Sequence, residues 1–228
     1  MEERIVGMII GAAVGDALGS PVEFMSREQI TIKHGRVTGM IGGGWLGLRP
    51  GQWTDDTAMM LCLLESLVEK GEFDQKDVAS RYLAWFRTRP ISIGNTVRAA
   101  LALMESERLE PEEAARRAYE GATEKEADND TVMRCCPLAA RFYEDDQKLI
   151  ATSYLEARIT HWDVKAAAGS ALLNLTLSRL LKGYKKSEAF GEASEVLLDN
   201  PFGLYPVVGD VAYLKAVSYT HLTLPTKA

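Results

Sequence analysis

The sequence has few cysteines and no pattern that would pair them. Only three occur in 228 residues, Cys62, Cys135 and Cys136, and two of these are neighbours. An odd count with two adjacent residues argues against a disulfide framework and favours a reducing compartment. No pair has the spacing of a structural zinc site. We therefore expect a cytoplasmic protein without structural disulfides or zinc.

Positive charge and long apolar runs are also scarce. The 26 Lys and Arg residues are outnumbered by 32 Asp and Glu, for a net charge of −6, and no dense basic cluster occurs. This balance argues against nucleic acid as a partner. No uncharged stretch has the length of a membrane span, and residues 1–4 are not the basic start of a signal peptide. We expect neither a nucleic-acid nor a membrane partner.

Alternating strand patterns are absent, whereas helical periodicity recurs along the chain. Hydrophobic residues make up 46% and charged residues 25%, which is ordinary globular composition. The predicted fold class is all-α, a compact multi-helix bundle in one domain. The predicted helices cover residues 5–18, 58–68, 77–87, 97–104, 111–125, 132–142 and 164–181.

Glycines cluster in two places. Gly7, Gly11, Gly15 and Gly19 recur every four residues, which predicts a helix with one smooth face packed closely against a neighbour. Residues 25–53 contain seven more and read as a loop. This loop lacks the Gly-Lys-Ser/Thr motif of a phosphate cradle, so a flexible connection beside a site is the favoured interpretation.

The segment Gly51-Gln52-Trp53-Thr54-Asp55-Asp56-Thr57 leads directly into a strongly apolar helix. Thr54 is a suitable N-cap, and carboxylates in a first turn are favoured by the helix dipole. One Asp would be enough for that purpose. Two adjacent Asp between two Thr also offer the oxygen ligands that Mg²⁺ prefers. The residues alone leave capping and metal binding open, with capping ahead.

Three further polar residues have both a structural and a functional interpretation. Asn95 lies where a helix begins, so it is a candidate cap. His161 precedes a long helix rich in small residues, a position at which a structural hydrogen bond is commoner than catalysis. Glu23 follows Pro21 in a loop, where a surface carboxylate is the simple interpretation.

Taken together, four ordered motifs resemble the ADP-ribosylglycohydrolase family, which includes the dinitrogenase-reductase activating glycohydrolases. They span about residues 5–182: Gly11–Gly19 with Pro21, Glu23 and Phe24; Gly51–Thr57; Ile93–Arg98; and Thr160-His161. The resemblance implies an all-α fold with two Mg²⁺ or Mn²⁺ ions in a cleft. It also implies hydrolysis of the bond between C1″ of ADP-ribose and a protein side chain or small molecule.

The resemblance further implies roles for individual residues. Thr54, Asp55 and Asp56 match metal ligands, and Glu23 matches an acidic residue beside the metals, so the expected catalytic residues are Glu23, Asp55 and Asp56. Asn95 and His161 match substrate-pocket positions. These residue types suit the reaction, because an oxocarbenium-like transition state needs nearby anionic groups and an activated water.

Two departures from the family pattern qualify this expectation. Residues 128–134 stand where the family has Asn flanked by glycines, so Asp128 and Asp130 alter that loop. The family's C-terminal Gly-Asp-Thr-Asp segment is absent, and residues 217–228 resemble translated adapter sequence. We expect residues 1–216 to form one domain that lacks its C-terminal portion, with a non-native tail and an exposed groove near Met59, Met60 and Leu63. The alternative function is a non-catalytic member that at most binds ADP-ribose-like ligands.

Overall fold

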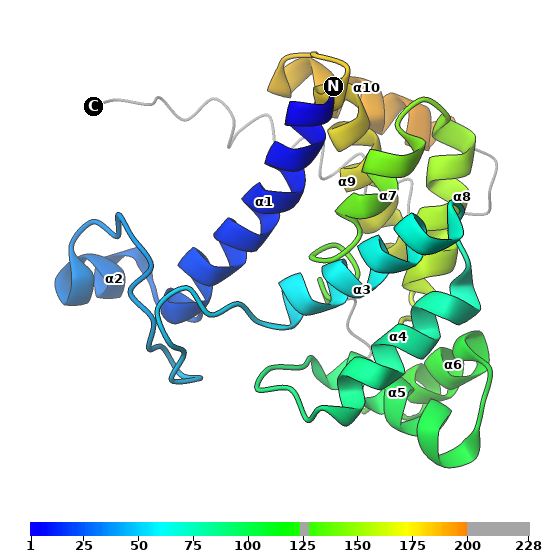
Figure 1. Ribbon diagram of the computed structural model, residues 1–228, viewed down its shortest axis with the longest axis horizontal. Coiled ribbons are helices and arrows are strands. Elements are labelled where there is room, and N and C mark those ends of the chain that lie inside the picture. The colour runs from blue at the N-terminus through cyan, green and yellow to red at the C-terminus, as the bar shows by residue number, and fades with distance from the viewer. Residues whose placement is uncertain (124–127, 200–228) are drawn as a thin grey trace.

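The computed structural model describes residues 1–123 and 128–199, and the regular secondary structure of this part of the chain is helical (Figure 1). It contains ten α-helices, one short 3-10 helix and no strand; an isolated bridge pairs Gly43 with Leu48. The predicted all-α class is confirmed. The predicted tail, residues 217–228, lies outside the described residues. The elements are α1 Glu2–Gly19, η1 Ser20–Val22, α2 Arg27–His34, α3 Asp55–Lys70, α4 Gln75–Arg87, α5 Asn95–Glu107, α6 Pro111–Gly121, α7 Cys136–Phe142, α8 Asp146–Ala157, α9 Val164–Leu181 and α10 Lys186–Leu198.

The sequence pattern missed three helices, α2, α8 and α10. Helix α2 buries none of its residues, so it has no apolar stripe that periodicity could reveal. Its start is nevertheless encoded by a capping box, in which the Ser26 hydroxyl accepts from the Gln29 N–H and the Gln29 side chain accepts from the Ser26 N–H. Helix α8 is capped by Asp145, whose side chain accepts from the Lys148 N–H.

Helix α9 lies at the centre of the bundle, between α7, α8 and α10. Eleven of its residues are buried, many of them Ala or Ser, which lets the neighbouring helices approach closely. Helix α3 packs its apolar residues into the same core. Met59, Met60 and Leu63 are all fully buried, so the expectation that they border an exposed groove is wrong for Met59 and Leu63. Met60, although buried, lines an apolar cavity between α1, α3 and α9.

Residues 1–53 form a distinct region, which we call the N-terminal arm; it comprises α1, η1, α2 and the glycine-rich loop. Figure 1 shows α1 and α2 to one side of helices α3–α10. Only Ala17 of α1 is buried, and Val6, Ile10 and Val14 are exposed. An apolar cavity of about 630 Å³ separates α1 from α3 and α9, with Met8, Met60 and Leu177 among its lining residues.

The close packing predicted for the glycine face of α1 is wrong for the described part of the chain. At Gly7, Gly11, Gly15 and Gly19, an added Cβ atom would meet no described atom within 4 Å. The segment Glu2–Val22 is long and apolar enough to pass as a membrane span by length and composition, with a mean hydropathy of 1.6. For a single helix near an N-terminus, length and composition are weak evidence of a membrane span.

Both ends of α1 are tied to the bundle by polar contacts. The Arg4 guanidinium donates to the Leu181 carbonyl at 2.9 Å. At the other end, the Asp16 carboxylate accepts from the backbone and hydroxyl of both Thr54 and Thr57. These contacts hold α1 against α3 and α9, where Asp16 reaches the first turn of α3.

Candidate active site

Four carboxylates line one pocket where the arm meets α3. We call it the acidic pocket; its volume is about 310 Å³, and its carboxylates are Asp16, Glu23, Asp55 and Asp56. No Lys or Arg is among the described residues that line it. The remaining lining residues are Gly15, Gly19, Ser20, Val22, Thr54 and Ser92. The sequence motif around Asp55 and the predicted Glu23 therefore meet in a single pocket.

The first turn of α3 is capped by a carboxylate from another helix. Thr54 occupies the N-cap position as predicted, but its side chain makes no capping hydrogen bond. Asp16 fills that role instead, with Oδ2 accepting from the Thr54 N–H at 2.9 Å and the Thr57 N–H at 3.2 Å. The Thr57 hydroxyl donates to the same oxygen at 2.6 Å. Sequence reasoning gave no role to Asp16, although it lies within the Gly11–Gly19 motif and is the one charge in an apolar run.

Within the acidic pocket, the pKa values of Asp16 and Asp56 are shifted in opposite directions. Burial raises the pKa of Asp16, but hydrogen bonds from Thr57, Thr54 and Ser20 outweigh it and leave that pKa below its usual value. Burial and the charges of Asp16 and Asp55 raise the pKa of Asp56 to about 6. Crowded carboxylate oxygens of this kind suit a hard divalent cation, whose charge would offset their repulsion. The donor set of Thr54, Asp55 and Asp56 thus fits the metal that the resemblance implies.

A second pocket, of about 600 Å³, opens beside the start of α5. Asn95, Thr96, Tyr119, Asp128 and Asp130 are among its lining residues. We call it the α5 pocket.

Gly94 joins the two pockets. Its N–H donates to Asp55 Oδ2 at 3.2 Å, and a Cβ atom at this position would lie 1.9 Å from Asp130 Oδ2. A residue with a Cβ atom at this position would therefore require the Asp130 carboxylate to move away from it.

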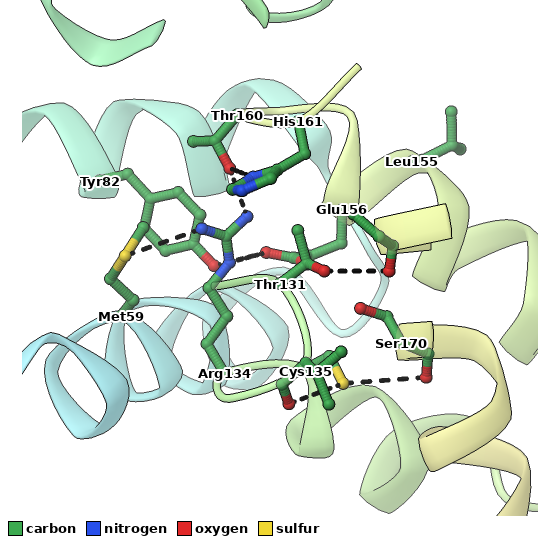
Figure 2. Close-up of polar contacts among 12 residues, drawn as sticks. Met59, Tyr82, Thr131, Arg134, Cys135, Leu155, Glu156, Thr160, His161 and Ser170 are labelled. Atoms are coloured by element: carbon green, nitrogen blue, oxygen red, sulfur yellow. Dashed lines mark hydrogen bonds and ion pairs between the residues drawn. The ribbon is translucent and has the colours of Figure 1, made fainter. Parts of the chain in front are cut away.

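His161 is buried behind the α5 pocket and belongs to a chain of hydrogen bonds that begins in the core (Figure 2). Arg134 Nη2 donates to Thr160 Oγ1 at 2.9 Å, and Thr160 Oγ1 lies 2.8 Å from His161 Nδ1. Since the Thr160 oxygen accepts from Arg134, its own proton is available to Nδ1. His161 Nε2 then carries a proton and donates it to Asp128 Oδ1. Asp128 Oδ2 accepts from the Thr96 hydroxyl at 2.6 Å.

The start of this chain is a fully buried ion pair. Arg134 Nε contacts Glu156 Oε1 at 2.6 Å, and the Tyr82 hydroxyl donates to the same oxygen at 2.7 Å (Figure 2). The Arg134 guanidinium also lies over the Tyr82 ring, 4.8 Å from its centroid. Removing one partner of such a pair would leave an uncompensated buried charge. Arg134, held by Glu156 and Tyr82, is the group that donates to the Thr160 hydroxyl.

Asp128, Asp130 and His161 form a group that could hold a metal ion, with ligand atoms within 4.8 Å of one another. Burial and the charge of Asp128 raise the pKa of Asp130 to about 6. Burial also raises the pKa of Asp128, but hydrogen bonds from His161 and Thr96 lower it below its usual value. Sequence reasoning named His161 but assigned no role to the two Asp, although their departure from the family's glycines marked the loop.

The structure divides the predicted site residues between the two pockets. Glu23, Thr54, Asp55 and Asp56 line the acidic pocket. Asn95 lines the α5 pocket as the first residue of α5, one position after the actual N-cap, Gly94. His161 is reached from that pocket through Asp128. The catalytic, metal-binding and substrate-binding roles of these residues stay predictions.

Comparison with known proteins identifies the family. Residues 1–223 match the family model described as ADP-ribosylglycohydrolase. The chain belongs to the ADP-ribosylglycohydrolase family. Within that family it is 35% identical over 202 residues to the ADP-ribosyl-[dinitrogen reductase] glycohydrolase of Rhodospirillum rubrum, covering 86% of this chain and 64% of the relative. It is 32% identical over 196 residues to the ADP-ribosylarginine hydrolase Tri1 of Serratia proteamaculans, covering 82% and 50% respectively.

A solved family structure supports the fold. The protein titled "ADP-ribosylglycohydrolase-related protein complex" superposes with a TM-score of 0.66 at 34% identity, covering 91% of this chain and 62% of that one. The chain therefore spans between half and two thirds of the length of these ADP-ribosylglycohydrolase relatives.

Proposed function

We propose that this chain is part of an enzyme that hydrolyses the glycosidic bond at C1″ of ADP-ribose. The substrate would be an ADP-ribosylated protein side chain or an ADP-ribose-containing small molecule. The observation that carries this proposal is the convergence of Asp16, Glu23, Asp55 and Asp56 on one pocket without a described basic residue. Negative charge at that point would stabilise an oxocarbenium-like transition state.

Mg²⁺ or Mn²⁺ is the cofactor we propose, held by Thr54, Asp55 and Asp56. When bound, the ion would supply Lewis-acid chemistry to the ribose hydroxyls and the attacking water. Two ions in the intact protein are an extension of this proposal. The side chain of Glu23 is exposed on the rim of the pocket, so it is available as the base that takes a proton from water.

The remaining residues would bind the substrate. Asn95 and Thr96 offer polar groups to the α5 pocket, and Gly94 connects that pocket to Asp55. His161 is held between Thr160 and Asp128 behind the α5 pocket, so it would act on the substrate by orienting the Asp128 carboxylate. The three unpaired cysteines support a further proposal, that the protein works in a reducing compartment such as the cytoplasm.

One observation favours the second candidate, a non-catalytic member of the family. The α5 pocket contains Asp128 and Asp130, and none of its described lining residues is Lys or Arg. These two carboxylates would repel the anionic diphosphate of ADP-ribose. The group of Asp128, Asp130 and His161 would favour such a ligand only with a cation bound.

Release of free ADP-ribose from an ADP-ribosylated arginine peptide, with Mn²⁺ or Mg²⁺ present, tests the proposal. Replacing Glu23 with Gln should lower the rate by about 10²–10⁴-fold, the usual contribution of a general base. The matched control is Glu28→Gln, an exposed carboxylate of the same arm, which should leave the rate unchanged. No metal-dependent release by the unmodified chain, together with measurable ADP-ribose binding, would favour the non-catalytic candidate.

A further inference from the structure

Three arginines line a pocket at the end of α4 that the proposed function does not use. We call it the basic pocket; its volume is about 550 Å³, and its lining residues are Phe86, Arg87, Arg89, Pro90, Arg98 and Glu105. Arg87 and Glu105 neutralise each other, since Arg87 Nε donates to Glu105 Oε1 at 2.8 Å. The guanidinium groups of Arg89 and Arg98 remain, so the basic pocket is positively charged in a chain whose net charge is −6.

The side chains of Arg89 and Arg98 are exposed, and neither forms a hydrogen bond or an ion pair with a described residue. Other arginines of the same helical region are engaged. Arg81 and Arg116, for example, each contact two or more carboxylates. The donors of Arg89 and Arg98 are therefore available to a ligand that enters the basic pocket.

The backbone at Arg89 has a conformation that favours glycine. Arg89 follows Thr88, the C-cap of α4, and its φ of +57° lies in the left-handed region. Gly71 has this conformation at the end of α3, where a Cβ atom is absent and costs nothing. Arg108, at the end of α5, shares the conformation of Arg89 but does not line the basic pocket. The backbone alone thus marks no site, but it supplies a variant that removes the Arg89 side chain without strain.

The basic pocket adjoins the proposed active site through the loop of residues 88–94, which projects from the ends of α4 and α5 (Figure 1). Ser92 of this loop lines the acidic pocket, and Gly94 lines the α5 pocket. On the other side of the loop, the Arg98 N–H donates to the Gly94 carbonyl at 2.9 Å in the first turn of α5. A ligand in the basic pocket would lie beside the two site pockets and would not occupy either of them.

The chemistry of the basic pocket fits a carboxylate on an extended chain better than a bare phosphate. Phosphate sites commonly add backbone N–H groups to their basic side chains. Here the Arg89 N–H is used by the Phe86 carbonyl at 3.1 Å, and Pro90 has no N–H. Phe86 and Pro90 instead give the pocket a half-buried apolar surface beside its guanidinium groups. Acidic and apolar side chains of a peptide match such a surface together.

We propose that the basic pocket binds an acidic segment of the protein that carries the ADP-ribose, with Arg89 and Arg98 pairing with its carboxylates. The proposal rests on the proposed function and adds a binding surface outside the reacting bond. A guanidinium matches the fork geometry of a carboxylate. The carboxylates of the acidic pocket would repel the same segment, so the basic pocket decides on which side of the active site it lies.

Two nearly isosteric peptides test the basic pocket without any need for turnover. N-acetyl-Glu-Glu-Phe-Glu amide is charged, and N-acetyl-Gln-Gln-Phe-Gln amide is not. We expect NMR titration of the full chain to give a Kd about two- to thirtyfold lower for the glutamate peptide, as two exposed ion pairs would provide. The preference should shrink in about 0.5 M NaCl, because salt screens exposed charges. Equal affinities at low salt would overturn the proposal even if hydrolysis were established, whereas a preference without hydrolysis would support the basic pocket and contradict the proposed function.

Variants locate the preference for the glutamate peptide. Arg89→Gly and Arg98→Gln should each reduce it, and the double variant should abolish it. Arg108→Gly is the matched control, because it removes an exposed arginine of the same backbone conformation outside the basic pocket and should keep the preference. Both glycine variants should melt at nearly the temperature of the unmodified chain, since glycine adopts the left-handed region freely. An equal loss of the preference in Arg108→Gly and Arg89→Gly would reveal an effect of net charge alone and overturn the assignment.

Inorganic phosphate, added as a competitor, distinguishes the two kinds of anion. It should displace the glutamate peptide only at concentrations well above the peptide's own Kd. Displacement near that Kd would assign the basic pocket to a phosphate group and overturn its assignment to protein carboxylates. Kinetics give a further readout with ADP-ribosylated peptides flanked by Glu or by Gln. Arg89→Gly should raise KM for the first peptide only and leave kcat unchanged for both, whereas a lower kcat with either peptide would contradict a surface that only binds.

Discussion

Helices α1 and α9 have the same length, 18 residues, and both are rich in apolar and small residues. Eleven residues of α9 are buried, but only Ala17 of α1. The difference lies in their neighbours. Among the described residues, α9 is packed by α7, α8 and α10, whereas α1 contacts α3 and α7 and is tied at its two ends by Arg4 to Leu181 and by Asp16 to Thr54. An apolar helical sequence therefore predicts a helix, but not which of its faces is covered.

The less buried of the two regions carries half of the acidic pocket. Asp16 and Glu23 come from the N-terminal arm, and Asp55 and Asp56 from α3 in the bundle. The relative position of these carboxylates thus depends on how firmly α1 is held. A site divided in this way is expected to be more sensitive to changes in the arm than the overall stability is.

The largest expected effect is a contrast between two truncations, one in each helix. Leu175→Ala in α9 removes a fully buried side chain and should lower the free energy of unfolding by about 2–5 kcal/mol. Ile10→Ala in α1 removes a side chain that is more than half exposed, and should change it by less than about 0.5 kcal/mol. Urea denaturation of both variants measures the difference.

The measurement on Ile10→Ala can contradict this expectation. A loss in Ile10→Ala as large as that in Leu175→Ala would show that the apolar face of α1 is covered in solution. The comparison between the two helices would then fail. Val14→Ala, one turn further along the same exposed stripe, is the control, because it should repeat the result for Ile10.

Much of the fold could be predicted from the sequence, because most helices carry an apolar stripe or a clear boundary residue. Helix α3 ends at Gly71 in the left-handed conformation, as the Lys-Gly pair predicts. Helix α2 could not be found from a stripe that it lacks. The carboxylates of the acidic pocket were given roles from their motifs, except Asp16, which lies within the Gly11–Gly19 motif but whose partners are 38 and 41 positions away. A contact at that separation leaves no local pattern.

The α5 pocket shows the same limit. Asn95 and His161 were placed by resemblance, but the pair Asp128 and Asp130 had no role, since nothing local indicates that Asp130 lies against Gly94. The contact between Phe24 and Trp45 could not be predicted either, because the glycines around Trp45 resemble those of a flexible loop. Their positive φ angles and the approach to Pro21 become evident only in three dimensions.

The next effect in size concerns a buried carboxyl group of the bundle. Asp130 is 8% exposed, and its pKa is raised from 3.8 to about 6. The folded state then binds a proton at Asp130 more tightly than the unfolded state does, so the contribution of this group to stability is greatest at low pH and falls as the pH rises from about 4 through 6. A shift of about two units corresponds to about 3 kcal/mol. Asp130→Asn should therefore stabilise the chain at pH 7 by up to about 3 kcal/mol.

The pH provides the control for this variant. At pH 4 the buried carboxyl is protonated and resembles an amide, so Asp130→Asn and the unmodified chain should unfold at nearly the same urea concentration. Added Mn²⁺ gives a second comparison. If Asp128, Asp130 and His161 hold a cation, the advantage of Asn at pH 7 should disappear on adding metal. A variant that is less stable than the unmodified chain at pH 7 without metal would contradict the raised pKa.

The smallest effect is expected at the contact that joins the two regions. In Asp16→Asn, the amide oxygen can still accept from the N–H groups of Thr54 and Thr57, but the negative charge is lost and an NH2 group replaces the oxygen that accepts from the Thr54 hydroxyl. Hydrogen bonds to charged groups contribute about 1.5–3 kcal/mol, and Asn keeps part of them, so we expect a loss of about 1–2 kcal/mol. This loss corresponds to a factor of about 5–30 in local opening, which amide hydrogen exchange at Thr57 and along α1 would detect.

The direction of the pH dependence separates this contact from that of Asp130. Because the pKa of Asp16 is lowered in the folded state, its contribution is present above the ordinary value of 3.8 and is lost as the pH falls below it. Asp16→Asn should thus exchange faster than the unmodified chain at pH 7, and the difference should shrink toward pH 3. Asp163→Asn, at the N-cap of α9, is the matched control, since Asn caps a helix as well as Asp does. Equal exchange at Thr57 in all three chains would mean that α1 is held to α3 by something other than Asp16, and that the two regions are joined more firmly than their described contacts indicate.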